Sequence, residues 1–378
     1  MHDLKIKIYN TFDDDKLKKE WQKIFEENHY FVQNSYEWCH TWWKYFHSKN
    51  RILHIATVES NGNIVGIAPM FILLKPFHNQ LKFIGAGLTD FHELIIIKNE
   101  LYISIFDLLL SYFKSYVNWN IILFDHINNE TNEFQHFKTN NIKCKLLTEC
   151  IILDLDGLNW KQYLTIISSK NFRKLYKRRR NKFEREKNKK LEVIKDSNDI
   201  REYLDKLFEV HARRWDTVNK DSKFKQPEIR SFLRDILCLL SEKRLIILYV
   251  LLDDDNIISY RLGFLNDNTY FDWNTGYDPE YEIYAPGKLI TGYIIEDLIN
   301  NKFRYFNFMR GGYYYKKQWI PEGKEHISEN YQFVLGDKSL TGRISEYYYL
   351  RLRDPLKSIF KILLSNRYIR FIFKLDKQ

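Results

Sequence analysis

The sequence is poor in residues that interrupt or cross-link a chain. Its 378 residues include 7 prolines, 14 glycines and 4 cysteines. So few prolines and glycines leave little room for long flexible linkers. The cysteines form no CxxC pair, and the 11 histidines show no metal-ligand spacing. We therefore expect neither a metal site nor a disulfide framework, and a reducing, cytoplasmic location is the simpler interpretation.

Long hydrophobic runs are also missing. The first 16 residues contain no apolar signal-peptide core. The longest apolar runs, such as Leu245–Leu252, are far shorter than the ~20 residues that cross a bilayer. These absences exclude a classical secretory signal and a membrane span, and they leave peripheral contact at the inner face of a membrane open.

The positive charge is concentrated in one segment. Residues 170–190 hold 12 Lys or Arg and 2 Glu, which matches the whole formal net charge of +10. Clustered cations of this kind neutralise phosphates without reading a base sequence, so nucleic acid, and tRNA in particular, is one possible partner. The alternative is a solvated helix face, with Phe172, Tyr176 and Phe183 packed inward.

The length and the hydrophobic content of 44% favour two domains with large cores. In the first part, we expect helices over 14–30, 35–46 and 101–117 and strands near 81, 97 and 120–127. Residues 51–74 read as a hairpin whose turn contains Asn61-Gly62. This order predicts an α/β lobe that ends near residue 150.

The second part shows a similar order of elements. Residues 160–190, 198–215 and 228–241 have helical patterns, and 244–278 read as three strands joined by tight turns. A loop then leads into a helix over 284–303, and a strand follows at 304–312. The similar order suggests a duplicated fold, although no clear sequence repeat is visible.

A possible anion site lies at the start of the 284–303 helix. The first N–H groups of a helix lack intrahelical partners and attract anions. Pro286 suits the first turn because it lacks an N–H group, and Gly287 lets a ligand approach the backbone. Lys288 adds positive charge. This turn could hold the pyrophosphate of coenzyme A, or it could simply start a helix.

The strand that follows ends in a second group of polar residues. Arg310 stands at its carboxyl end, where open α/β sheets place ligand contacts. Tyr315, Lys316 and Trp319 come shortly after it. Tyr can donate a proton to a leaving thiolate, and Lys and Arg can hold an anionic group. The alternative is a basic surface loop with Trp319 in the core.

Several short segments follow one another in the second part of the chain: Lys170–Arg173, His211–Trp215, Gly276–Pro279, Tyr284–Gly287, Phe306–Gly311, Tyr315-Lys316 and Trp319. Taken in order, they resemble the CelD/BcsL-type (cellulose-biosynthesis-type) acetyltransferases of the GNAT superfamily, which are related to the FemABX aminoacyltransferases. The match spans roughly 165–320, and SYEW at 35–38 and the turn at Gly87–Phe91 resemble weaker marks of the preceding lobe.

This resemblance implies an α/β fold of two GNAT-like lobes in tandem, with mixed sheets flanked by helices. It implies an N-terminal lobe over 1–150, a lobe with the donor site over 151–335, and a basic amphipathic tail over 336–378. It further implies an acetyl-CoA or longer acyl-CoA donor, no metal, and an amine or hydroxyl acceptor on a sugar or an envelope or exopolysaccharide precursor, which could be lipid-linked.

The resemblance also assigns roles to residues. The donor's pyrophosphate would lie on the turn formed by Tyr284, Ala285, Pro286, Gly287, Lys288 and Leu289. The substrate-binding residues would be Arg310, Lys316, Trp319, Arg173, Trp215, Asp90, Tyr36 and Trp38.

The sequence departs from the family pattern at two acidic positions. Asn307 replaces the usual Asp of F-D-F, and Gly312-Tyr313 replaces an acidic pair after R-G. A general base is still needed to accept the acceptor's proton. Asp272 and His211 are the candidates that remain, with Tyr315 as the proton donor.

Two other function classes stay open at this point. One is a FemABX-like transferase that takes its group from aminoacyl-tRNA. The other is a non-catalytic protein that binds acyl-CoA or nucleic acid. The tail, which holds LKSIFKILLSNRYIRFIFKL, could lie on an anionic membrane or could cover an apolar face of the second lobe.

Overall fold

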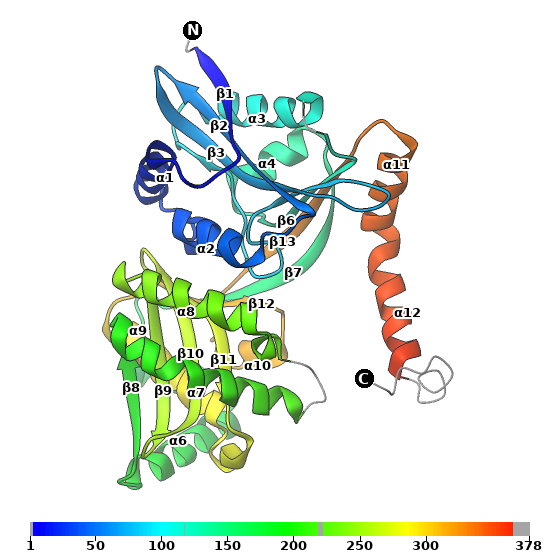
Figure 1. Ribbon diagram of the computed structural model, residues 1–378. Helices are drawn as coiled ribbons and strands as arrows, with labels where there is room; N and C mark the ends of the chain where they lie inside the picture. Colours follow the sequence, from blue (N-terminus) through cyan, green and yellow to red (C-terminus); the bar gives the residue numbers. More distant parts are fainter. Residues whose placement is uncertain (1–2, 117, 218–221, 366–378) are drawn as a thin grey trace.

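One large mixed sheet organises the molecule (Figure 1). The computed structural model describes residues 3–116, 118–217 and 222–365. The 13-stranded sheet has the order β1-β2-β3-β4-β6-β13-β7-β12-β11-β10-β9-β8, with β5 paired to β3. The strands are β1 Leu4–Tyr9, β2 Arg51–Ser60, β3 Asn63–Leu73, β4 Gln80–Phe83, β5 Ile95–Ile96, β6 Ile121–Asn128, β7 Lys143–Asp154, β8 Lys189–Ile194, β9 Ile246–Asp253, β10 Asn256–Asn266, β11 Thr269–Tyr277, β12 Tyr305–Arg310 and β13 Glu325–Gly336.

The helices cover both faces of this sheet and confirm the expected α/β class. They are α1 Asp15–Glu27, α2 Tyr36–Phe46, α3 Tyr102–Tyr116, α4 Asn132–Thr139, α5 Trp160–Ile166, α6 Lys170–Arg185, α7 Ser197–Asp216, α8 Pro227–Glu242, α9 Pro286–Asn300, α10 Tyr314–Lys317, α11 Leu340–Tyr347 and α12 Arg353–Ser365. Shorter turns are η1 Val32–Asn34, η2 Lys223–Lys225, η3 Pro279–Tyr284 and the π-type turn η4 Tyr348–Leu352.

Local sequence signals place most of these elements. Ser35 caps α2 by accepting a hydrogen bond from the backbone N–H of Trp38 at 3.2 Å, as expected for a Ser at this position. The predicted hairpin turn at Asn61-Gly62 joins β2 and β3, and both residues have positive φ. The basic segment expected to be helical over 160–190 forms two helices, α5 and α6, which are separated by a turn with φ of 40° at Ser168.

We call the part from β1 to β7 in sheet order the first lobe and the part from β12 to β8 the second lobe. β13 falls in the segment expected to belong to the second lobe, yet it lies between β6 and β7 of the first. β7 also pairs with β12. Strand pairing is therefore continuous from one lobe to the other.

The lobes also share a hydrophobic core. Helices α1 and α2 of the first lobe and α7 and α8 of the second contribute buried side chains to one cluster, in which Trp38 packs edge-to-face on Phe232 and Trp273. A second cluster packs α5, α6 and α9 on the opposite face of the second lobe. A third packs α3 and α4 on the first lobe. The shared cluster fixes the lobes against each other.

Each lobe contains a parallel strand pair that separates after three residue pairs. In the first lobe, β4 pairs with β6 over Gln80–Lys82. In the second, β11 pairs with β12 over Thr269–Phe271, and β11 then continues to Tyr277 while β12 bends away. A gap between parallel strands exposes backbone groups that a ligand or another segment must satisfy.

Candidate functional site

A pocket opens where β11 and β12 separate, and we call it the basic pocket. Its volume is about 820 Å³. It lies beside the carboxyl end of β11 and the start of α9. The lining residues are Arg179, Arg214, Trp215, Arg261, Thr275, Gly276, Tyr277, Glu282, Ala285, Pro286, Gly287, Lys288, Tyr313, Tyr315 and Trp319.

The amino end of α9 presents free backbone to this pocket. Ala285, with φ of 48°, caps the helix, and its carbonyl accepts from the N–H groups of Lys288 at 2.9 Å and Leu289 at 3.1 Å. Pro286 has no N–H group to donate. The N–H of Gly287 has no partner among the described backbone groups. A Cβ atom on Gly287 would meet nothing within 4 Å. The geometry suits an anion that approaches the helix closely.

The charge of the pocket suits the same ligand class. Four cationic side chains and one carboxylate, Glu282, line it. Arg214 lies over the ring of Tyr277 at 4.6 Å, and Lys288 lies over that of Phe172 at 5.1 Å. Burial lowers the pKa of Lys288, and the nearby Arg179 lowers it further. Cations held close together in this way attract a polyanion such as a pyrophosphate.

A buried ion pair supports the wall of the basic pocket. Arg261 on β10 donates to a carboxylate oxygen of Asp272 on β11, and both side chains are almost fully buried. Arg261 also reaches the carbonyl of Gly287 at 3.4 Å. The Oδ1 atom of Asp272 is buried without a hydrogen-bond partner in the described part of the chain. Burial raises the pKa of Asp272, and Arg261 opposes that rise.

Lys316 holds the end of β12 in its bent course. Its ammonium group donates to the carbonyls of Phe308 at 2.8 Å, Met309 at 3.2 Å and Arg310 at 2.7 Å. The β12–β7 register shifts at this point, and Met309 has φ of 57°. Burial lowers the pKa of Lys316 to about 8. Lys316 therefore maintains the separation of β12 from β11.

The two lobes meet through a charged contact at the end of β12. Arg310 forms an ion pair with the buried Asp90 of the first lobe, and its Nη1 lies 2.9 Å from Nε2 of His126. Burial raises the pKa of Asp90, and Arg310 opposes that rise. Burial, together with Arg310, lowers the pKa of His126 to about 3, so this imidazole is neutral and accepts the hydrogen bond.

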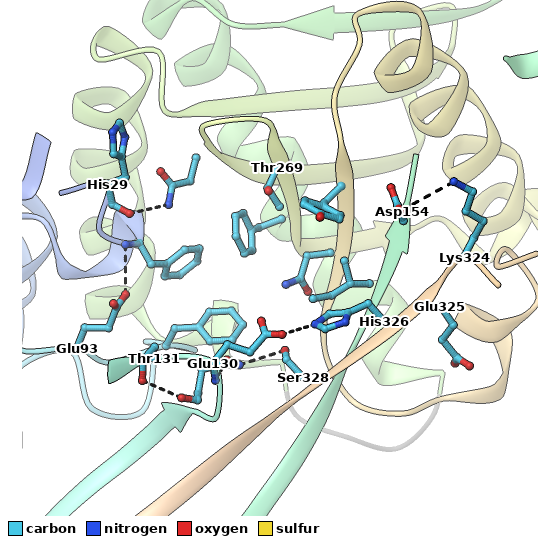
Figure 2. A pocket seen from close by; sticks show the side chains of 18 of the residues that line it. His29, Glu93, Glu130, Thr131, Asp154, Thr269, Lys324, Glu325, His326 and Ser328 are labelled. Atoms are coloured by element: carbon cyan, nitrogen blue, oxygen red, sulfur yellow. Dashed lines mark hydrogen bonds and ion pairs between the residues drawn. The ribbon is translucent and has the colours of Figure 1, made fainter. Parts of the chain in front are cut away.

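A second pocket lies between the lobes, and we call it the inter-lobe pocket (Figure 2). Its volume is about 640 Å³. Figure 2 shows His326 in contact with the carboxylate of Glu130 on one side and Lys324 facing Asp154 on the other. The charged groups of Lys324 and Asp154 are 3.9 Å apart. Buried amide groups and aromatic rings complete the lining. The lining acids are Glu93, Glu130, Asp154 and Glu325, and burial raises the pKa of Glu93 to about 7. The other three outnumber the lining lysine, Lys324, so this pocket has the opposite charge to the basic pocket.

A chain of buried polar groups links the inter-lobe pocket to the end of β12. Asn128 donates to Ser328 at 3.1 Å and to the side-chain oxygen of Asn330 at 2.9 Å. Asn330 in turn donates to the carbonyl of Asp90 at 2.8 Å. Asp90 pairs with Arg310. Polar groups therefore connect the inter-lobe pocket to the region where β11 and β12 separate.

The structure brings many of the predicted site residues together. The basic pocket is lined by Ala285, Pro286, Gly287, Lys288, Trp215, Tyr315 and Trp319. Asp272 and Lys316 lie behind this lining and interact electrostatically with each other. Arg310 and Asp90 form the contact between the lobes. Asn307, which replaces the family's Asp, lines the inter-lobe pocket and accepts from the N–H of Met309 at 2.8 Å.

Besides Asp90, Arg310 and Lys316, five predicted binding residues also line neither pocket. Tyr284 and Leu289 pack in the core beneath α9, and Tyr284 donates to Glu186 at 2.7 Å. Arg173 donates to the carbonyls that end α5, at 2.9 and 2.7 Å. Tyr36 and Trp38 are buried in the core shared by the lobes, where they donate to Phe12 at 2.8 Å and Thr89 at 2.9 Å. Aromatic and basic residues in a motif can thus serve packing rather than contact with a ligand.

His211 has no nitrogen free for a substrate proton. Its Nε2 accepts from the indole N–H of Trp215 at 2.8 Å, which leaves the proton on Nδ1, 2.7 Å from the hydroxyl of Ser222. Burial lowers its pKa to about 4. The side chain therefore fixes the end of α7 rather than offering a base.

Sequence reasoning missed several lining residues. Arg261 carried a usable signal, because a single Arg within the apolar strand Asn256–Asn266 must be paired or exposed at a site. Arg179 and Arg214 were hidden among many other basic residues. No sequence pattern marked the inter-lobe pocket, since its residues come from seven separate segments.

Comparison with known family models identifies one domain in the second lobe. Residues 170–317 match the family model described as an acetyltransferase (GNAT) domain. No curated protein matches the chain. Within residues 3–116, 118–217 and 222–365, no group of three or more His, Cys, Asp or Glu could hold a metal ion.

Solved structures share the fold at low sequence identity. The match to the crystal structure of FemX covers 87% of this chain and 97% of the FemX chain, with 12% identity and a TM-score of 0.58. The match to the structure of L-PGS from Bacillus licheniformis covers 90% of this chain and 98% of the L-PGS chain, with 14% identity and a TM-score of 0.56. The C-terminal domain of a putative lysylphosphatidylglycerol synthetase from Agrobacterium fabrum covers 79% and 89%, with 11% identity and a TM-score of 0.50. The matched domain is of the GNAT type, and these structures show that the whole chain shares their fold; neither comparison distinguishes the CelD/BcsL type.

Proposed function

We propose that the protein is an acyltransferase that takes an acetyl or longer acyl group from acyl-CoA bound in the basic pocket. The observation that carries this proposal is the pocket between β11 and β12, with the free N–H of Gly287 at one end. The pyrophosphate would lie on the first turn of α9, near Lys288 and Arg179. The pantetheine would extend into the gap, where the strand backbones offer hydrogen-bond partners.

The transfer step needs three things from the chain. The acceptor's amine or hydroxyl attacks the thioester carbonyl, loses a proton, and displaces the thiolate, which must gain one. Tyr315 lines the basic pocket and is the proposed donor to the thiolate. The proposed acceptor of the proton is Asp272, whose unpartnered Oδ1 is buried behind this lining, so the proton must be relayed to it by a group or a water in the pocket. Lys316 acts as a positioning residue, because it fixes the bend of β12 beside the thioester.

The acceptor would enter from the inter-lobe pocket. Its carboxylates favour a ligand with an amino group, and its amide groups and aromatic rings suit a polar ring such as a sugar. An amino sugar, or an envelope or exopolysaccharide precursor that carries one, fits this lining. An acceptor that carries hydroxyl groups and no amino group could still form hydrogen bonds with the amide groups of this lining.

Thiol release tests the proposal. Acetyl-CoA is mixed with glucosamine, and free coenzyme A is followed with a thiol reagent for the native protein, Lys316→Met and Lys317→Met. We expect the native protein and Lys317→Met to turn over, since the side chain of Lys317 is exposed and pairs with Glu325 at 3.8 Å. Lys316→Met should lose roughly 100-fold in turnover with little change in donor binding. Tight binding of acetyl-CoA without turnover by any amine or sugar would instead indicate a non-catalytic binding protein.

The second candidate is a transferase that uses aminoacyl-tRNA. The observation that favours it is the outer face of α6, where Lys170, Lys174, Lys177, Arg178, Lys182 and Arg185 are all exposed. A tRNA bound there should dissociate as the salt concentration rises. Replacing Lys174, Lys177 and Arg178 by Gln should make the logarithm of the binding constant fall less steeply with the logarithm of the salt concentration. Retention of charged tRNA together with failure to bind acetyl-CoA would select this candidate.

A further inference from the structure

The helical segment at the carboxyl end of the described chain stands beside the body of the molecule (Figure 1). α11, η4 and α12 follow one another without a break. Tyr349 faces inward, where it accepts from Gln80 at 2.8 Å and packs on β6 and β13. The outward side chains are apolar and between 38% and 76% exposed: Leu340, Ile344, Tyr347, Tyr348, Leu352, Leu356 and Ile359. We call these seven residues the apolar stripe.

The π-type turn is what aligns this stripe. In an uninterrupted α-helix, each residue advances by about 100°, so Leu356 would point about 160° away from Leu340. The wider turn at Tyr348–Leu352 holds one extra residue and sets every later side chain back by about one residue step. Leu352, Leu356 and Ile359 then point within about 60° of Leu340. The two helices therefore share one apolar face.

Charges are segregated around the stripe. The two carboxylates of the segment, Glu346 and Asp354, turn toward the body and pair with Lys143 and Lys145 of β7. Arg343, Arg351 and Lys357 are exposed, and none of them forms an ion pair with a described residue. By the same step of about 100° per residue, Arg343 and Arg351 lie beside the stripe, whereas Lys357 points about 160° away from Leu340. The outward side of the segment thus carries apolar residues with two cations beside them, while the carboxylates of the segment pair with the body.

We propose that the apolar stripe lies on an anionic membrane surface. An amphipathic helix with exposed cations beside an apolar face inserts at the boundary between headgroups and acyl chains. Anionic headgroups complement Arg343 and Arg351, the exposed cations beside the stripe. No helix in the described part of the chain has the length and apolar character to span a bilayer, so the contact is confined to the surface. This inference is independent of the donor and the acceptor.

Sedimentation with vesicles tests it on the full chain. Vesicles contain phosphatidylcholine either alone or mixed with phosphatidylglycerol. The native protein should sediment with the mixed vesicles and much less with the neutral ones. Leu352→Glu with Leu356→Glu should abolish this sedimentation, and Ile103→Glu, which changes an equally exposed apolar residue on α3, should not. Arg343→Gln and Arg351→Gln should each weaken the association by roughly fivefold.

Two outcomes would overturn the proposal. One is equal sedimentation of the native protein and the Leu352→Glu/Leu356→Glu variant. The other is a native dimer in solution that this double variant converts to a monomer without any vesicle binding by the native protein, because the stripe would then join two copies. Far-ultraviolet circular dichroism checks that the variants keep their helix content.

Discussion

Each lobe contains a pair of parallel strands that separate after three residue pairs, but only the gap in the second lobe is open. β11 and β12 separate around an open basic pocket, whereas the gap between β4 and β6 is filled by the chain itself. There, the N–H of His92 donates to the carbonyl of His126 at 3.1 Å, and its ring stacks on Phe83 at 4.9 Å. A ligand site therefore needs more than separated strands: the following segment must leave the gap open.

The segments after the two strands explain this difference. β11 leads through η3 directly into α9, so the helix begins at the gap and turns its free N–H group toward it. β4 leads into a turn at 85–89 and then into residues that fold back on β6. The first-lobe helix α3 begins only at Tyr102. The first lobe thus supports the second and contributes Asp90 to the contact between them.

The largest expected effect concerns the ion pairs beside the two gaps. Arg261→Met leaves Asp272 as an unpaired buried charge and should lower the free energy of unfolding by about 3–5 kcal/mol. In the first lobe, Lys82 contacts Asp125 at 3.8 Å, and both are one-fifth exposed. Lys82→Met should therefore cost only about 1–2 kcal/mol. Urea denaturation of both variants measures the difference, and equal losses would contradict it.

The next effect concerns the starts of the two helices. Gly287→Glu places bulk and negative charge where the donor's pyrophosphate should lie, and it should weaken acetyl-CoA binding by roughly 100-fold or more. Ile103→Glu is the matched control, because Ile103 is the second residue of α3 and Gly287 is the second residue of α9. Ile103 is exposed, and Gly287 is half-buried. Titration calorimetry should show unchanged binding for this control. A similar loss in both variants would indicate a general electrostatic effect.

The smallest expected effect concerns His92, which fills the gap between β4 and β6, and it appears in how the free energy of unfolding depends on pH. Burial lowers the pKa of His92 to about 4 in the folded protein, below its ordinary value of about 6.5. Between these values, the unfolded chain binds a proton that the folded chain does not, so stability should fall as pH drops from 6.5 to 4. His92→Gln should remove the part of this fall that comes from His92. Urea unfolding at several pH values measures it, and an unchanged pH profile would show that His92 is not the group responsible.

Much of the fold was predictable because its signals are local. Caps, turns and apolar periodicity marked most helices and the three consecutive strands β9–β11. β13 was not expected in the first lobe, because its place between β6 and β7 depends on pairing with strands almost 200 residues away. Such long-range pairing leaves no local pattern.

The site was predictable to a similar extent. The turn at Pro286–Lys288 combines a helix start, a glycine and a cation within three residues, so its place in a pocket could be predicted, while its role in donor binding stays a prediction. The roles of Arg261 and Lys316 could not, since each depends on partners that only the folded sheet supplies. Nothing local separates Arg173, which binds backbone carbonyls, from Arg179, which lines the basic pocket.

The stoichiometry of donor binding tests the contrast between the lobes most directly. Titration calorimetry of the unaltered protein with acetyl-CoA should give one site per chain, because the second lobe alone presents an open gap and a free helix start in the described residues. Two equivalent sites would contradict this contrast, since the first lobe would then bind donor as well. Absence of binding by acetyl-CoA and by longer acyl-CoAs would contradict the donor assignment itself and would make charged tRNA the ligand to test next.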